Sequence, residues 1–141
     1  MFDLAARVVV AEFPGADLPV AVRTTGVEPE LRTAASDRLS DAAVEAVDAL
    51  LRQVEGTIGV ITPPSRKAAI ARRLRQVELS GWDRLSVTTS VEAKGLEYDG
   101  VLVVEPAELL AEPRGVRALY VALTRATQRL TTVGADLSWL P

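Results

Sequence analysis

The apolar positions of the chain change several times between helical and strand spacing. Between residues 40 and 56, apolar residues recur at intervals of three and four, with Ser40 as the expected N-cap and Gly56 as the end. The same spacing predicts helices over residues 65–79 and 115–128. These segments are long enough and periodic enough to form amphipathic helices that cover a core.

Four runs of apolar, largely β-branched residues alternate with these helices: 57–62, 85–89, 101–104 and 129–134. Continuous apolar runs are typical of strands that are covered on both faces. The alternation predicts an α/β fold of the RecA-like type, a mostly parallel sheet flanked by helices. In such sheets ligands gather at the carboxyl ends of the strands, so we expect a site in the connection 90–100.

The remaining segments are less regular. A helix is predicted over residues 3–13, edge strands over Val20–Arg23 and Glu30–Thr33, and a short helix within 105–115. We expect the whole chain, 1–141, to be one domain, with residues 1–36 as its less defined edge.

Composition then narrows the chemistry. The 141 residues are 48% apolar with a mean hydropathy of +0.18, and no apolar run is long enough to span a membrane. The absence of cysteine excludes disulfides and thiolate ligands, and the absence of histidine excludes a Ser-His-Asp triad. We expect a cytoplasmic protein without a metal site or a membrane partner. With a net charge of -3, any phosphate must be bound locally.

The connection SVEAKGLEYDG, residues 90–100, is strongly polar although it joins two buried strands. Lys94 and Gly95 would permit a close turn, and Glu97 could accept hydrogen bonds from the hydroxyls of a sugar. A charged loop is more often simply a solvated surface, and that alternative stays open.

A second candidate lies in RALYVALTRATQRL, residues 117–130. Arg125 stands between Thr124 and Ala126, small neighbours that would let a large ligand approach. Its planar guanidinium suits phosphate better than lysine does, and could stabilise charge on a phosphoryl group in transfer. The ordinary alternative is a solvated arginine.

These two segments carry a resemblance to a known family. TTSVEAKGLEYDGVLVV resembles motif V of superfamily 1 helicases and translocases, and ALYVALTRATQRL resembles their motif VI, in the same order. The runs EYDGVLVVEPAELL and GTIGVITP resemble HelD-type proteins, which are related to the UvrD/Rep helicases and which act on bacterial RNA polymerase. The resemblance extends over residues 56–134.

The resemblance implies that the chain is most of the second RecA-like domain of a larger ATP-driven motor. Glu97, next to Gly95, would contact the ribose of ATP, and Arg125 would be the catalytic arginine that reaches the γ-phosphate. Tyr120 and Thr124 would help to place the motif VI helix.

By the same resemblance, Thr88, Thr89 and Lys94 would contact nucleic acid or couple the site to it. The implied partners are the first RecA-like domain of the same parent, together with RNA polymerase or DNA.

Two departures from the family pattern limit these expectations. No GxxxxGK[ST] loop occurs in the chain, nor an Asp-Glu pair placed to hold Mg²⁺, so Glu97 and Arg125 offer half a site. We expect Met1 to lie within a longer protein, and the chain alone to bind ATP weakly and to hydrolyse none. Val91 also replaces the histidine that UvrD/Rep helicases commonly carry in motif V, which fits a protein partner as well as DNA.

Three functions follow in order of preference: a HelD-type motor domain, a UvrD/Rep-type DNA helicase domain in repair or replication, and a stand-alone binding module without catalysis. One further feature is a stripe of basic residues on the helix predicted over residues 65–79. It could follow a phosphate backbone, but we favour a solvated face that acids elsewhere balance. Its members are Arg66, Lys67, Arg72, Arg73 and Arg75.

Overall fold

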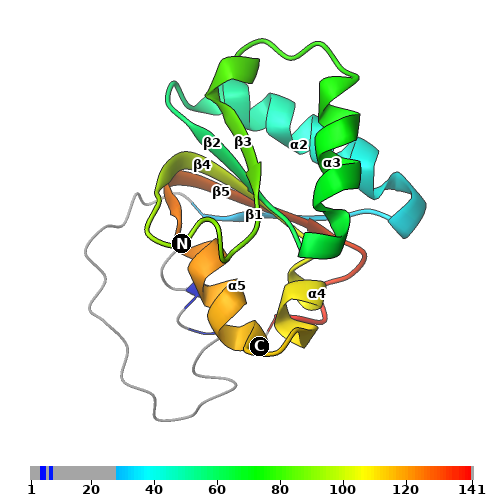
Figure 1. The fold of residues 1–141 in the computed structure, drawn as a ribbon, viewed down its shortest axis with the longest axis vertical. Coiled ribbons are helices and arrows are strands. Elements are labelled where there is room, and N and C mark those ends of the chain that lie inside the picture. Colours follow the sequence, from blue (N-terminus) through cyan, green and yellow to red (C-terminus); the bar gives the residue numbers. More distant parts are fainter. Residues whose placement is uncertain (1–3, 6, 8–27, 141) are drawn as a thin grey trace.

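A single five-stranded sheet in which every neighbouring pair is parallel forms the centre of the molecule (Figure 1). The structure, a computed structural model, describes residues 4, 5, 7 and 28–140. The strand order is β1-β5-β4-β2-β3, which confirms the predicted α/β fold. The strands are β1 (Glu30–Thr33), β2 (Ile58–Ile61), β3 (Leu85–Thr88), β4 (Tyr98–Val104) and β5 (Ala126–Gly134).

Helices cover both faces of this sheet (Figure 1). α2 and α3 lie on one face, and α4 and α5 lie on the other. None of the described helices has the length and apolar character that crossing a bilayer requires. The helices are α2 (Leu39–Gln53), α3 (Lys67–Arg75), α4 (Pro106–Ala111) and α5 (Gly115–Leu123), with short 3-10 helices η1 (Ser36–Arg38), η2 (Pro64–Arg66) and η3 (Trp82–Arg84).

The core divides into two clusters, one on each face of the sheet. The middle of β4 feeds both, because successive side chains of a strand point to opposite faces. Val101 and Val103 pack with α4 and α5, whereas Leu102 and Val104 pack with α2 and α3. The uninterrupted apolar run of this strand therefore reflects burial on both sides.

Three predicted helix boundaries are wrong. α2 begins at Leu39 as a continuation of η1, and Ser40 does not cap it. α3 ends at Arg75 rather than at residue 79, and α5 ends at Leu123 rather than at residue 128. In the last case strand pairing overrides helical spacing, because Ala126 pairs with Tyr98 as the first residue of β5.

The amino-terminal predictions have a mixed outcome. The edge strand Glu30–Thr33 is confirmed as β1, which pairs with β5 at one end of the sheet. Leu4, Ala5 and Arg7 are helical, as predicted for residues 3–13. The other residues of that helix, and the strand predicted at Val20–Arg23, lie outside the described residues.

Arg84 joins the end of α2 to the start of β3. Its guanidinium donates to the carbonyl oxygens of Leu51 (2.8 Å), Val54 (2.9 Å) and Gly56 (2.8 Å). The last carbonyls of a helix have no partner within the helix, and a cation at that end also complements the helix dipole. One side chain thus fixes the connection between α2 and β2 against the neighbouring segment.

We predict that Arg84→Ala lowers the free energy of unfolding by about 2 kcal/mol, because several partly buried carbonyls lose a charged donor. The stability of Arg84→Lys should lie between that of Arg84→Ala and that of the wild type, since an ammonium cannot reproduce the rigid, planar set of N–H donors of a guanidinium. Urea unfolding measures both. The control is Arg72→Ala, which changes an exposed residue of α3 and should leave the free energy of unfolding within about 0.5 kcal/mol of the wild-type value. An equal loss in Arg84→Ala and Arg72→Ala would contradict the role of this clamp.

Candidate functional site

The connection between β3 and β4 runs from the carboxyl ends of the strands back to their amino ends, which are called here the carboxyl edge and the amino edge of the sheet. β3 ends with Thr88 at the carboxyl edge, and β4 begins with Tyr98 at the amino edge, since both strands run parallel to β2. Between them Ala93 is fully buried in the same core cluster as α5. The expectation that the site lies at the carboxyl ends is therefore wrong for Glu97, which immediately precedes β4 at the amino edge.

Arg125 lies at the same edge, immediately before β5. The backbone N–H of Tyr98 donates to the carbonyl oxygen of Arg125 (2.9 Å), so the starts of β4 and β5 are joined. The Nη1 atom of Arg125 donates to the carbonyl oxygen of Leu96 (3.3 Å), the residue next to Glu97. The structure thus brings the two principal candidates of the sequence together.

The guanidinium of Arg125 is positioned by the end of α5. Its Nε donates to the carbonyl oxygen of Val121 (3.1 Å), and its Nη2 donates to the hydroxyl of Thr124 (3.3 Å). That hydroxyl donates in turn to the carbonyl oxygen of Tyr120 (2.8 Å). A guanidinium has five N–H donors. Three hydrogen bonds within the described residues, counting that to Leu96, leave two donors for a ligand.

The segment beside this arginine is open to solvent. Glu97 is exposed and forms no ion pair with the described residues, and Leu96 is 50% exposed. Gly95 has φ +84 with nothing close to where a Cβ would stand. The predicted close turn is therefore present, and glycine suits it because other residues rarely adopt positive φ. The side chain of Glu97 remains available as an acceptor.

The two threonines at the carboxyl edge are engaged within the chain. Thr88 is buried, and its hydroxyl donates to the carbonyl oxygen of Thr89 (3.4 Å). Thr89 and Glu92 form a capping box: the Thr89 N–H donates to the Glu92 carboxylate (3.1 Å), and the Glu92 N–H donates to the Thr89 hydroxyl (3.3 Å). The T-x-x-E spacing that signals this turn was visible in the sequence.

Lys67 completes this turn. Its ammonium donates to the Glu92 carboxylate (2.8 Å), which, with the Thr89 contacts, holds the pKa of Glu92 below its usual range. The start of α3 is therefore tied to the start of the polar connection. Lys94, further along, is exposed and lines a surface pocket with residues of α5.

Most residues of the basic stripe form ion pairs with acidic residues, as predicted for a solvated face that acids elsewhere balance. Lys67 pairs with Glu92, and Arg73 pairs with Asp41 (2.9 Å). Arg72 and Arg75 form no ion pair with the described residues. The third balanced residue, Arg66, belongs to a larger cluster.

Arg66 joins η2 to α4 across the carboxyl edge of the sheet. Its Nε donates to both carboxylate oxygens of Glu108 (2.8 and 3.0 Å), and a second carboxylate, Glu105, lies 3.7 Å from Nη2. Arg66 lowers the pKa of Glu108, whereas burial raises the pKa of Glu105, which accepts the Ala135 N–H (2.8 Å). Nothing in the sequence pattern paired these residues, because Arg66 and Glu108 are far apart along the chain.

We predict that Glu108→Gln destabilises the fold at neutral pH and that the difference from wild type disappears in acid. A lowered pKa in the folded state stabilises the fold above the ordinary Glu pKa, and that stabilisation is lost as pH falls through the lowered value. Unfolding by urea across this pH range measures the difference. The control is Glu112→Gln, a carboxylate without an ion pair in the described residues. A pH-independent difference for Glu108→Gln would contradict the ion pair.

The parallel sheet and its two helical layers define a RecA-like α/β domain. Residues 85–133 match the family model described as the UvrD-like helicase C-terminal domain. This segment runs from the start of β3 almost to the end of β5 and includes Glu97 and Arg125. The match therefore falls on the part of the chain that forms the candidate site.

The fold is similar to a solved structure, the C-terminal domain of a possible DNA helicase from Lactobacillus plantarum WCFS1. The TM-score is 0.68 with 20% sequence identity, and the alignment covers 94% of this chain and 81% of that chain. At this identity the likeness establishes the fold alone. The search of curated proteins found no match.

Proposed function

We propose that this chain is the second RecA-like domain of a superfamily 1 motor and that Glu97 and Arg125 form its half of an interdomain ATP site. The observation that carries the proposal is the contact of the Arg125 guanidinium with the Leu96 carbonyl, beside Glu97. Residues from motif-like segments far apart in the sequence thereby meet at one exposed edge of the sheet.

The chemistry of the pair suits a nucleoside triphosphate. Glu97 offers carboxylate oxygens to ribose hydroxyls. Arg125 stays charged at every relevant pH, and its two unused N–H donors suit phosphoryl oxygens. Because Nε is fixed on α5, less side-chain freedom is lost when phosphate binds, and such preorganised charge is what favours a phosphoryl-transfer transition state.

The other half of the site would come from the first RecA-like domain of the parent. A phosphate loop and the Mg²⁺ ligands are needed to grip the triphosphate, and the GxxxxGK[ST] pattern does not occur in these 141 residues. ATP and Mg²⁺ therefore belong to the intact parent, whereas this chain alone binds ATP weakly. Closure of the two domains around ATP would be converted into movement of a partner.

For the parent we favour a HelD-type motor that acts on RNA polymerase. The run EYDGVLVVEPAELL supports this choice, and so does Val91, which is 81% exposed where UvrD/Rep helicases commonly carry a histidine. An exposed aliphatic side chain suits a protein surface better than a phosphate backbone.

A UvrD/Rep-type DNA helicase is the second candidate, because the family match fits it equally well. ATP-driven unwinding of a DNA duplex by the intact protein would select the DNA helicase. ATP-dependent release of nucleic acid from RNA polymerase, without unwinding, would select the HelD-type motor.

In the intact protein, we predict that Arg125→Ala lowers ATP turnover about a thousandfold, as for other arginines that act on the transferring phosphoryl group. Nucleotide affinity should fall by less than about tenfold, because the contact is strongest in the transition state. Steady-state hydrolysis and binding of a non-hydrolysable ATP analogue measure the two effects separately.

The matched control is Arg72→Ala, which removes an arginine from α3 that forms no ion pair with the described residues. Arg125→Lys should recover only part of the turnover, because lysine keeps the charge but loses the fork. Unchanged turnover in Arg125→Ala would defeat the proposal.

A further inference from the structure

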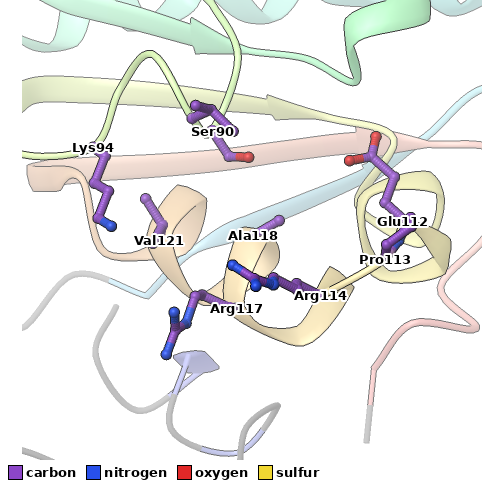
Figure 2. A pocket seen from close by; sticks show the side chains of 9 residues that line it. Ser90, Lys94, Glu112, Pro113, Arg114, Arg117, Ala118 and Val121 are labelled. Carbon is purple, nitrogen blue, oxygen red and sulfur yellow. The ribbon is translucent and has the colours of Figure 1, made fainter.

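A surface pocket of about 290 Å³ lies between the polar connection and α5 (Figure 2). The connection contributes one wall, the turn between α4 and α5 a second, and the first turns of α5 the floor. Neither Glu97 nor Arg125 lines it. The lining residues are Ser90, Val91, Lys94, Glu112, Pro113, Arg114, Arg117, Ala118 and Val121.

Positive charge dominates this pocket. Lys94 comes from the connection and Arg114 and Arg117 from the start of α5, against the single carboxylate of Glu112 (Figure 2). None of the three cations forms an ion pair or a side-chain hydrogen bond with the described residues. In a chain of net charge -3, three cations around one hollow, without an acidic partner in the part of the chain that the structure describes, form a local exception.

Arg114 holds an unusual backbone conformation beside the pocket. It has φ +61, which is uncommon for a residue other than glycine. Arg114 lies in the α4–α5 turn, where the next residue, Gly115, packs so closely on the Leu110 carbonyl that no Cβ could fit. The Ala118 N–H also donates to the Arg114 carbonyl oxygen (3.0 Å). Glycine would adopt this conformation at a lower cost, so an arginine at this position points to a use for its side chain.

Apart from Ser90, the uncharged part of the lining is aliphatic, and none of it is aromatic. Pro113, Ala118 and Val121 line it together with Val91, which is 81% exposed. Sequence-independent binding of single-stranded nucleic acid relies on aromatic side chains that stack on bases, and the lining has none. An aliphatic floor with a cationic rim matches a peptide that carries both carboxylates and an aliphatic side chain.

We propose that this pocket binds an acidic segment of a protein partner, with one aliphatic side chain on the floor and carboxylates on Lys94, Arg114 and Arg117. The two guanidinium groups can each bind a carboxylate through paired hydrogen bonds. An acidic peptide complements the positive charge of the pocket, and the lining has no aromatic side chain on which a nucleic-acid base could stack. The proposal goes beyond the ATP site and stands whether or not that site is confirmed.

The test uses the 141-residue chain and a fluorescein-labelled twelve-residue peptide of Asp and Glu with Leu at every third position. Fluorescence anisotropy at low salt should show saturable binding that weakens as salt is added. Arg114→Gly and Arg117→Gln should each weaken binding about tenfold, as arginines at the centre of an interface do. The matched control, Arg72→Gln, should bind as wild type does.

Arg114→Gly also separates binding from folding. Because glycine adopts positive φ readily, this variant should melt at the same temperature as wild type or higher, even as it loses the peptide. A peptide with Ser in place of Leu should bind more weakly, since it leaves the aliphatic floor empty.

Three results would overturn the proposal. The first is an absence of saturable binding of the acidic peptide to the wild-type chain. The second is binding that Arg114→Gly and Arg117→Gln leave unchanged, or that the Ser peptide reproduces in full. The third is tighter binding of a twelve-nucleotide oligothymidylate through the same arginines, which would identify the pocket as a nucleic-acid surface instead.

Discussion

The position of the candidate site depends on how the chain returns between β3 and β4. Because both strands run in the same direction, the connection must run back along the full length of the strands and pass β2, which lies between them in the strand order. Such returns usually contain a helix. Here residues 89–97 make the return as a series of turns, anchored by the capping box at Thr89 and by buried Ala93. The polar end of the connection therefore emerges at the amino edge.

This route also explains why the two candidate residues lie at the amino ends of the strands and not at the predicted carboxyl ends. The rule that ligands bind at the carboxyl ends of strands assumes that the functional residues follow a strand directly. Glu97 instead ends the connection, and Arg125 ends α5, so both precede a strand. Parallel pairing of β4 with β5 then makes them neighbours. The motif-like segments supplied the two candidates, and only the sheet register reveals that the segments carrying them lie side by side.

Other predictions succeeded or failed for similar local reasons. The buried strands were predictable because continuous β-branched runs have few alternatives in a globular chain. The end of α5 was not, since Ala126 and Leu130 continue a helical spacing although they belong to β5. The ion pair of Arg66 with Glu108 and the φ of Arg114 depend on tertiary contacts and leave no local signal. The capping box was a readable signal, whereas the partners of the basic stripe were not.

The pocket and the Glu97–Arg125 pair are built from the same two segments. The connection places Lys94 in the pocket and the Leu96 carbonyl on Arg125. α5 places Arg114 and Arg117 at its start, and its last turn holds the Arg125 guanidinium through Val121 and Thr124. A two-turn helix with intact hydrogen bonds moves as one rigid element. Any displacement of α5 by a ligand in the pocket would therefore displace the arginine at its other end, although a change in affinity requires that the two ligands favour different positions of the helix.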